Sequence, residues 1–407
     1  MSVIDFCAKV FPLRCGRVLR SKATSIFYNG QEGFVMADDT ERREGNVFSD
    51  GPKKVLLFPD RIRRWRDERP FEPVVVEIHP SERCNHRCPD CQSRWILGDR
   101  RVSELSRRGQ FMDLTILNGL WERPPEGIII SGQTGEPLMH PKIGELLLIL
   151  EKRSMPYVMI TNGGRMTRNL AEILVRSSRG IRVSLDGYDL ASFRSTHGVG
   201  KNEWKRVLQG IELLVEARRG AGVSRKSCLI GLGYLVGPAT KDGMERVTCL
   251  ASGLGVDYIH FRPFHFTDVT VDDQIDSCLA YARTDFSVLI SGQKYHLMMD
   301  GNWMNDRPYS ICHGAFFYSM IDPHGDIYVC CHHVGNERAK VGSLREVLWS
   351  DWLDSPVRRE SIRKFGLTRC VPLCRLNALN RVLQALLDGQ RLDPPTDSLV
   401  LLHRMFL

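Results

Sequence analysis

The stretch Pro73–Cys91, PVVVEIHPSERCNHRCPDC, gives the clearest structural signal in the chain. It opens with the apolar run VVV, which is typical of a strand buried on both faces of a parallel sheet. Three cysteines, Cys84, Cys88 and Cys91, follow this strand within eight residues. Because functional groups of parallel α/β folds lie at the carboxyl ends of the strands, we predict a metal site on this loop.

Short β-branched runs alternate with helical patterns from this stretch as far as residue 265. Strands are predicted at 73–80, 127–131, 157–161, 181–185, 229–236 and 258–264. Helices are predicted between them at 143–152, 168–177, 203–219 and 243–254. This alternation predicts an α/β fold with right-handed βαβ units around a parallel sheet. Six strands allow a partial (β/α)6 barrel or an open, doubly wound sheet.

The flanking segments differ from this α/β region, which spans residues 72–265. Residues 1–71 form a predicted N-terminal extension that is polar and glycine-rich, with a short helix at 59–67. A linker (266–305) leads to a small cysteine-bearing domain (306–381) with a predicted hairpin at 319–331, and an apolar helix and tail (382–407) follow.

The composition is that of an ordinary globular protein, with 26% charged and 43% hydrophobic residues in 407. The net charge of +8 is spread along the chain, apart from RIRRWRDER at Arg61–Arg69. We interpret this stretch as a solvated helix face, and attraction to an acidic substrate or partner is the alternative. No nucleic-acid-binding motif accompanies it, so we expect no nucleic-acid partner.

The apolar residues predict neither secretion nor membrane insertion. The first twenty residues lack a continuous apolar segment, and the densest run, LLLIL at 146–150, is too short to span a bilayer. We therefore expect a cytoplasmic protein without a membrane partner. Thiols stay reduced in that compartment, so the thirteen cysteines are better explained as metal ligands or free thiols than as disulfides.

Three thiolates leave one iron of a four-iron cubane open to an exogenous ligand, which is typical of catalysis. The C-x3-C-x2-C spacing after the first strand resembles the radical S-adenosylmethionine (SAM) superfamily, and the similarity continues through residues 73–265. The resemblance implies a [4Fe–4S] cluster on Cys84, Cys88 and Cys91, SAM on the open iron, and an electron donor such as flavodoxin or ferredoxin. Asp90 stands where the family usually has an aromatic residue. A zinc site completed by a residue such as His86 is the alternative.

The segment Thr134–Pro137 follows the second predicted strand and resembles the family's Gly-Gly-Glu-Pro turn, with threonine in place of the first glycine. Glycine lets the backbone approach a ligand closely, and glutamate supplies a carboxylate. The resemblance implies that Gly135 and Glu136 receive the amino group of SAM. An ordinary strand-to-helix turn is the alternative interpretation.

Polar residues also follow the third and fourth predicted strands. Asn162 ends one of them, while Ser184 and Asp186 lie two apart at the end of the next and so share a face. The resemblance implies that these residues, together with Arg194, contact the ribose and carboxylate of SAM. Helix capping is the alternative for the first three, and a surface position for the arginine.

Alternation along the first and sixth strands suggests a face for substrate. Glu77 and His79 share one side of the first strand, and His260 and Arg262 share one side of the sixth. A satisfied core histidine or a buried ion pair is the more ordinary explanation for any one of these four.

A second set of four thiols, Cys312, Cys330, Cys370 and Cys374, lies in the C-terminal segment. It resembles the SPASM/Twitch extension of radical SAM enzymes, which implies an auxiliary Fe–S cluster. Glycine spacing favours Cys330 over its neighbour as the ligand. Structural zinc is the alternative for this set, because four thiolates suit zinc equally well and two histidines follow.

The remaining cysteines considered are Cys228, Cys249 and Cys278, which we expect to be core residues. A hydrogen-atom donor among them is the alternative, and nothing in the sequence selects one.

The resemblance implies a partial (β/α)6 barrel with a smaller auxiliary-cluster domain against its open side. It also implies radical abstraction of hydrogen from a small-molecule substrate. We expect a sugar-like molecule or aminocyclitol, altered by dehydrogenation, dehydration, epimerisation or decarboxylation in a biosynthetic pathway. One alternative is maturation of a ribosomally made peptide. The other is a non-catalytic zinc-binding protein.

Overall fold

The computed structural model describes residues 52–133, 135–264, 269, 271–290, 307–370 and 374–396. Its centre is one ten-stranded sheet in the order β10-β9-β8-β1-β2-β3-β4-β5-β6-β7. The strands are β1 (Val75–Ile78), β2 (Gly127–Ile130), β3 (Tyr157–Thr161), β4 (Gly180–Ser184), β5 (Leu229–Val236), β6 (Tyr258–Pro263), β7 (Ser287–Ile290), β8 (Tyr318–Ile321), β9 (Asp326–Tyr328) and β10 (Lys340–Ser343). The run from β8 through β1 to β7 is parallel, and β8, β9 and β10 pair in antiparallel fashion.

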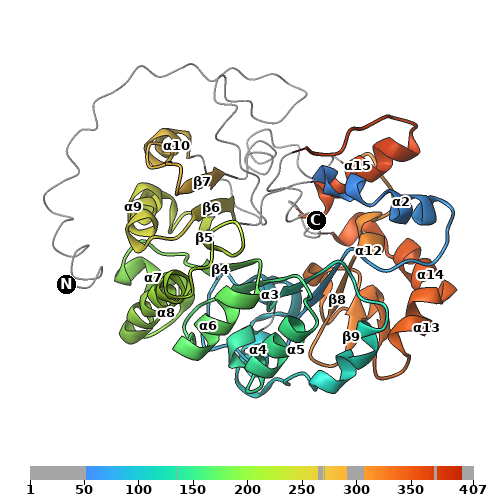
Figure 1. The fold of residues 1–407 in the computed structure, drawn as a ribbon, viewed down its shortest axis with the longest axis horizontal. Coiled ribbons are helices and arrows are strands. Elements are labelled where there is room, and N and C mark those ends of the chain that lie inside the picture. Colours follow the sequence, from blue (N-terminus) through green and yellow to red (C-terminus); the bar gives the residue numbers. More distant parts are fainter. Residues whose placement is uncertain are drawn as a thin grey trace, which may run out of the picture.

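Helices cover the outer face of this curved sheet (Figure 1). The α-helices are α2 (Pro59–Arg66), α3 (Gln92–Leu97), α4 (Asp99–Arg108), α5 (Ile143–Lys152), α6 (Arg168–Ser177), α7 (Leu190–His197), α8 (Lys201–Gly220), α9 (Met244–Leu254), α10 (Asp272–Leu279), α12 (Gly314–Phe317), α13 (Trp349–Asp354), α14 (Pro356–Lys364) and α15 (Asn377–Leu387). Short 3-10 turns include η1 (Pro52–Leu57), η3 (Pro137–Met139) and η5 (Cys331–His333). None of the helices that the structure describes is long and apolar enough to cross a bilayer.

The prediction of a partial parallel barrel is confirmed, and each of the six predicted strands is present. A seventh parallel strand, β7, extends the sheet beyond β6 and lies inside the segment predicted as a linker. Its four residues, SVLI, form too short a run to separate a strand from a loop by pattern alone. The neighbouring residues 291–306 lie outside the described part of the chain.

The C-terminal hairpin continues the same sheet. Val75 of β1 pairs in parallel with Tyr318 of β8, so the cysteine-bearing segment begins directly beside the strand that precedes the first cysteine loop. The domain boundaries stay a prediction, and residues 1–51 and 397–407 lie outside the described part of the chain.

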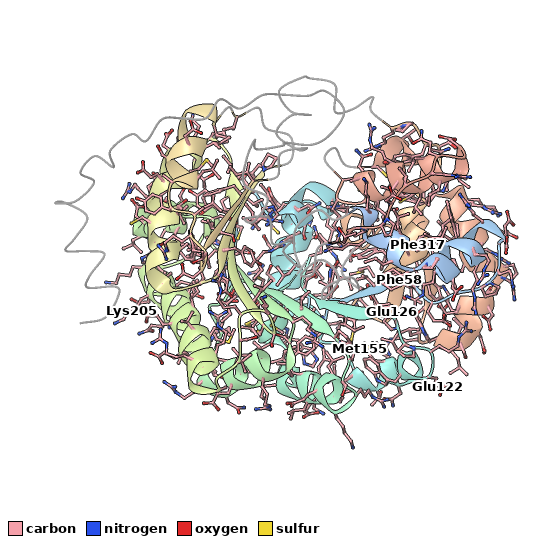
Figure 2. The ribbon with its side chains drawn as sticks, turned by 45° about the horizontal axis from the view of Figure 1, so that its top comes forward. Phe58, Glu122, Glu126, Met155, Lys205 and Phe317 are labelled. Atoms are coloured by element: carbon pink, nitrogen blue, oxygen red, sulfur yellow. The ribbon has the colours of Figure 1, made fainter. Side chains whose placement is uncertain are left out.

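The N-terminal helix α2 packs against the C-terminal segment rather than against the barrel helices. The ring of Trp65 meets those of His313 and Phe317 edge-on, at centroid distances of 5.3 and 5.8 Å. Figure 2 shows Phe58, just before α2, on the same side of the molecule as Phe317. Apolar contact between distant segments therefore joins the two ends of the described chain.

Glycines on β5 leave room inside the sheet. A Cβ atom at Gly231 would lie only 2.1 Å from the ring of Tyr258 on β6. One at Gly233 would lie 3.2 and 3.3 Å from the side chains of Arg262 and Arg182. These positions carry no side chain, so large groups from the flanking strands extend over β5.

Asp322 closes the turn between β8 and β9 and gives a stability prediction. Its Oδ1 accepts hydrogen bonds from the backbone N–H groups of His324 and Asp326, each at 2.9 Å. Burial raises the pKa of Asp322 from 3.8 to about 6. The folded state therefore binds this proton more tightly than the unfolded state, and stability falls as the pH rises from about 4 to about 6.

We expect Asp322→Asn to remove this pH dependence, because the amide oxygen can accept the same two bonds without a charge. The free energy of unfolding at neutral pH should rise by about 2 kcal/mol. Urea unfolding of both proteins on either side of this pH window measures the effect. A variant less stable than the wild type at neutral pH would contradict the prediction.

Candidate functional site

A cleft of about 340 Å³ opens at the carboxyl ends of the barrel strands. Its lining brings together eight of the predicted site residues: Cys84, Cys88, Cys91, Gly135, Glu136, Asn162, Ser184 and Asp186. Asp90, which stands at the usual aromatic position, also lines it. Arg194 is exposed on α7 and is not among the lining residues, so its contact with SAM stays a prediction that this geometry does not favour.

The cysteine loop is anchored by a carboxylate from the start of α8. Glu203 Oε1 accepts hydrogen bonds from Asn85 Nδ2 at 2.7 Å and His86 Nε2 at 3.2 Å. Burial opposes ionisation of Glu203, but the hydrogen bonds from His86, Arg206 and Asn85 outweigh it and lower its pKa to about 2. The loop between Cys84 and Cys88 is therefore held in place by charge-assisted bonds.

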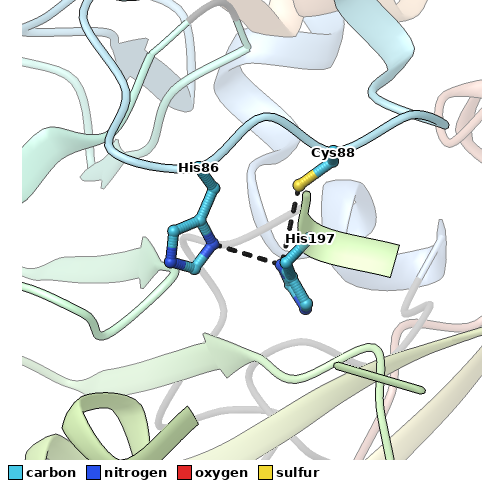
Figure 3. A group of neighbouring side chains, drawn as sticks. All are labelled: His86, Cys88 and His197. Carbon is cyan, nitrogen blue, oxygen red and sulfur yellow. Dashed lines mark hydrogen bonds between the residues drawn. The ribbon is translucent and has the colours of Figure 1, made fainter. Parts of the chain in front are cut away.

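His197, at the end of α7, contacts the same loop (Figure 3). Its Nε2 accepts the backbone N–H of Asp186 at 3.1 Å, so in the neutral ring Nδ1 carries the proton. Burial keeps the ring neutral by holding its pKa well below the ordinary value. Nδ1 lies 3.5 Å from Cys88 Sγ and 3.2 Å from His86 Nδ1, and can donate to either.

This tautomer bears on the zinc alternative. Among the residues that the structure describes, His86, Cys88 and His197 form the one set of metal-binding groups whose ligand atoms all lie within 4.8 Å of one another. A protonated Nδ1 cannot bind a metal, and His86 directs its other nitrogen to Glu203. The three groups therefore form a hydrogen-bonded cluster that supports the cysteine loop.

The thiols themselves fit a polynuclear centre. Burial, together with smaller contributions from the Glu136 carboxylate and Cys91, raises the pKa of Cys84 to about 12. Burial, and to a lesser extent the neighbouring thiols Cys84 and Cys91, also raise the pKa of Cys88 well above its ordinary value. Buried thiols with raised pKa values require a bound cation to ionise, and the open iron of a four-iron cubane leaves three sites for these thiolates.

The Gly-Glu-Pro turn is tightly constrained. A Cβ atom at Gly135 would lie 2.1 Å from the carbonyl oxygen of Ser81, so only glycine fits beside the cysteine loop. The preceding Thr134 lies outside the described residues. The backbone N–H of Glu136 donates to the carbonyl of Arg83 at 2.8 Å, which joins the turn to that loop.

The carboxylate of Glu136 connects two strand ends. Oε2 accepts the backbone N–H of Asn162 at 2.7 Å, and Oε1 accepts the N–H of Leu138 at 3.1 Å and the hydroxyl of Thr161. Burial nonetheless raises its pKa above the ordinary value. A cationic ammonium group beside this buried carboxylate would stabilise its ionised form.

The residues after β3 and β4 face the cleft and do not cap helices. The N-caps of α6 and α7 are Thr167 and Asp189, which rules out capping by the predicted ligand residues. Asn162 Nδ2 donates to Asn85 Oδ1 at 3.0 Å. Asp186 Oδ1 accepts the N–H of Leu235 at 2.7 Å.

Asp186 is also electrostatically distinct. Burial raises its pKa to about 6, although the backbone hydrogen bond and the nearby guanidinium groups of Arg262 and Arg182 oppose that rise. A hydroxyl group that donated to this carboxylate would help to keep it ionised.

The opposite side of the cleft contains a dense network around Glu77. Its Oε1 accepts from His79 Nε2 at 2.9 Å and from the Ser131 hydroxyl. Its Oε2 accepts from the Tyr318 hydroxyl and from the guanidinium of Arg375. Although the carboxylate is buried, the positive charge of Arg375 and these hydrogen bonds hold its pKa well below the ordinary range.

Of the predicted substrate-face residues, Glu77 and Arg262 line the cleft, whereas His79 and His260 do not. His79 instead forms a hydrogen bond with the carboxylate of Glu77. Sequence reasoning did not identify the lining residues Arg182, Ser131, Arg375, Cys331 and His197. Arg182 lies two residues before Ser184 on β4, so strand alternation could have indicated it. Nothing in the sequence placed Arg375 or Cys331 in this cleft.

The C-terminal thiols separate into two environments. Cys312 lies near Cys374 and Cys370, and Cys330 lies near Cys331, Cys374 and Cys312, since these neighbours raise their pKa values in addition to burial. Cys331 lies beside Arg375 and Glu77, with Cys374 also near it, and it lines the cleft, which Cys330 does not. Because Cys374 neighbours both cysteines, Cys330 as the fourth ligand stays a prediction. Metal binding by these four thiols, as an Fe–S cluster or as zinc, stays a prediction.

Two of the remaining cysteines, Cys228 and Cys278, are buried, and Cys249 is half-buried on α9. The sulfur of Cys228 lies 3.5 Å from the Ser178 hydroxyl. None of the three lines the cleft, so a hydrogen-donor role gains no support from its geometry.

Residues 78–234 match the Radical SAM superfamily model, and this range contains the cysteine loop, the Gly-Glu-Pro turn and the ends of β3 and β4. These residues form a radical SAM domain. The cofactors of that family are a [4Fe–4S] cluster and SAM, and the three thiols and the polar lining of the cleft suit both.

Two curated relatives match shorter stretches. The S-adenosylmethionine-dependent nucleotide dehydratase of Psychrobacter lutiphocae is 27% identical over 138 residues, which is 32% of this chain and 46% of the relative. The S-adenosyl-L-methionine-dependent tRNA 4-demethylwyosine synthase of Methanocaldococcus jannaschii is 30% identical over 95 residues, 23% of this chain and 29% of the relative. The chain thus spans less than half the length of either.

Among solved structures, Streptococcus suis SuiB bound to S-adenosylmethionine has a similar fold, with a TM-score of 0.52 and 16% identity. The match covers 78% of this chain and 74% of SuiB, so it extends well beyond the radical SAM domain. The same protein bound to the precursor peptide SuiA matches with a TM-score of 0.52 and 15% identity, over 81% and 75% of the two chains. At these identities the likeness concerns the fold alone.

Proposed function

We propose that this protein is a radical SAM enzyme that removes a hydrogen atom from an unactivated C–H bond of a small polar molecule. The observation that carries the proposal is the shared cleft, in which Cys84, Cys88 and Cys91 face the same space as Glu136 and Asp186. When bound, the cluster and SAM supply a 5′-deoxyadenosyl radical.

The chain's own residues would position SAM. We infer that Glu136 receives the amino group, because its carboxylate is buried and would gain from a neighbouring cation. Asp186 would accept hydrogen bonds from SAM, and Asn162 would donate or accept them. Both residues would act at the ribose and carboxylate of SAM. His197 would donate from Nδ1 toward Cys88 and so stabilise the thiolate form of that ligand.

The remaining lining would hold the substrate. Arg182 and Arg262 extend over Gly233, and Glu77 with Arg375 forms the far side. A surface this rich in charged donors and acceptors suits a sugar-like or otherwise polyhydroxylated molecule, and the nucleotide named for the Psychrobacter relative belongs to that broad chemistry. The C-terminal thiols would hold an auxiliary Fe–S cluster of the SPASM/Twitch type next to this side. Maturation of a peptide is the second candidate, and no described contact favours it.

The substrate class can be tested by isotope transfer. Reduced, SAM-loaded enzyme is offered, separately, a perdeuterated hexose, a deuterated aminocyclitol, a ribose-deuterated nucleotide and a deuterated peptide. Deuterium in the released 5′-deoxyadenosine identifies the compound attacked. Transfer from one of the three small molecules supports the proposal, and transfer from the peptide alone would contradict it.

A further inference from the structure

A second cavity lies at the other end of the sheet from the cleft. It has a volume of about 230 Å³ and lies beside Phe71 and Phe316, which precede the amino ends of β1 and β8. Its lining shares no residue with that of the cleft. The apolar part of its wall consists of Trp65, Pro70, Phe71, Ile311, Phe316, Leu353 and Leu387.

The polar part of the wall is strongly cationic. It contains five arginines, namely Arg66, Arg69, Arg358, Arg359 and Arg363, against one carboxylate, Glu68. Arg66 and Arg69 belong to the Arg-rich stretch Arg61–Arg69, which begins within α2. The other three arginines lie on α14. We call this site the arginine cavity. The remaining titratable group is His313, whose Nε2 lies 3.1 Å from Gln384 Oε1.

Three of the arginines have structural partners. Arg66 donates to the carbonyl of Leu386, and Arg363 Nη2 pairs with Glu68 Oε1 at 2.5 Å. Arg358 is buried and donates to the carbonyls of Phe71 and Phe316 at 2.8 and 3.0 Å. These bonds hold the walls of the cavity in place. They include only one carboxylate among the lining residues, Glu68, so the five arginines leave the wall with a net positive charge.

Two guanidinium nitrogens in this wall are buried without a hydrogen-bond acceptor among the residues that the structure describes. They are Nε of Arg358 and Nη1 of Arg359. The two residues are adjacent on α14, and both line the cavity. A buried donor that lacks an acceptor is unfavourable, and a guanidinium donor pairs best with a carboxylate or phosphate oxygen.

We propose that the arginine cavity binds a small organic anion, a carboxylate or phosphate carried on an apolar body. The oxygens would accept from Arg359 and Arg358, and the apolar body would lie against Trp65 and Phe71. The cavity volume equals that of roughly seven or eight liquid waters, which suits a ligand of the size of a single ring with one acidic group. This site is separate from the radical chemistry and does not depend on it.

Calorimetric titration of the full-length, cluster-loaded protein tests the site with three probes: phenyl phosphate, phenylacetate and uncharged benzyl alcohol. We expect at least one anion to bind and benzyl alcohol not to bind. Comparison of the two anions distinguishes a phosphate site from a carboxylate site. Arg359→Gln should weaken anion binding by ~10-fold or more, because it removes the charge that meets the ligand.

Lys364→Gln is the matched control, because it removes one positive charge from the same helix but lies outside the cavity lining. It should bind the anion as the wild type does. Arg69→Gln provides a second variant at an exposed position and should weaken binding by about 3-fold. Failure of both anions to bind the wild type would overturn the proposal, as would equal binding by wild type and Arg359→Gln in protein that still binds SAM.

Discussion

Replacement of Cys84, Cys88 and Cys91 together by alanine is expected to abolish SAM binding and to remove the iron of the N-terminal site. The physical reason is that these three thiols lie together on one loop of the cleft, while the neighbouring histidines, His86 and His197, are committed to hydrogen bonds with Glu203 and Asp186. If the C-terminal thiols hold iron as proposed, that iron should remain, because those groups form a separate cluster of neighbours.

Iron and sulfide analysis of anaerobically reconstituted protein, combined with EPR spectroscopy and a SAM titration, measures this result. Cys249→Ala is the matched control, since Cys249 is half-buried on α9 and lies outside both thiol groups. The control should keep the full iron content. A triple variant that retained all its iron, or a wild type that bound zinc in place of iron, would contradict the assignment.

Glu77→Leu is expected to produce the largest loss of stability among single substitutions in the cleft. It removes the acceptor of four side chains, His79, Ser131, Tyr318 and Arg375, and leaves a guanidinium without its carboxylate. Removal of one partner of a buried ion pair typically costs several kcal/mol. Because Arg375 reaches the cleft surface, we expect a decrease of about 3 kcal/mol in the free energy of unfolding.

Two companion variants separate the charge effect from packing. Glu77→Gln keeps the shape and part of the hydrogen bonding, so it should lose less stability than Glu77→Leu. The double variant Glu77→Leu/Arg375→Met removes both charges and should regain part of the loss. Denaturant unfolding of the four proteins gives the comparison. A Glu77→Leu protein as stable as the wild type would show that this network does not support the fold.

The barrel strands could be predicted because β1 to β6 are compact apolar runs followed by helical patterns. The pairing of β8 with β1 could not, since it joins segments more than two hundred residues apart in sequence, and no local pattern encodes such contacts. That pairing is what brings Arg375 and Cys331 to the cleft.

The candidate site was predictable to a similar extent. The thiol loop, Glu136 and Asp186 follow strands and therefore meet at one edge of the sheet. The support for this loop was not predictable, because Glu203 and His197 act through hydrogen bonds that depend on how α7 and α8 pack. The exposed position of Arg194 has the same origin, since a helix pattern alone did not show which of its residues faces the cleft.

The most direct test of the central proposal is reductant-dependent release of 5′-deoxyadenosine from SAM by the anaerobically reconstituted enzyme. We predict release by the wild type and by Cys249→Ala, and none by the triple cysteine variant. Absence of release from wild-type protein that carries a full iron–sulfur content and still fails to bind SAM in a titration would contradict the radical SAM function proposed here.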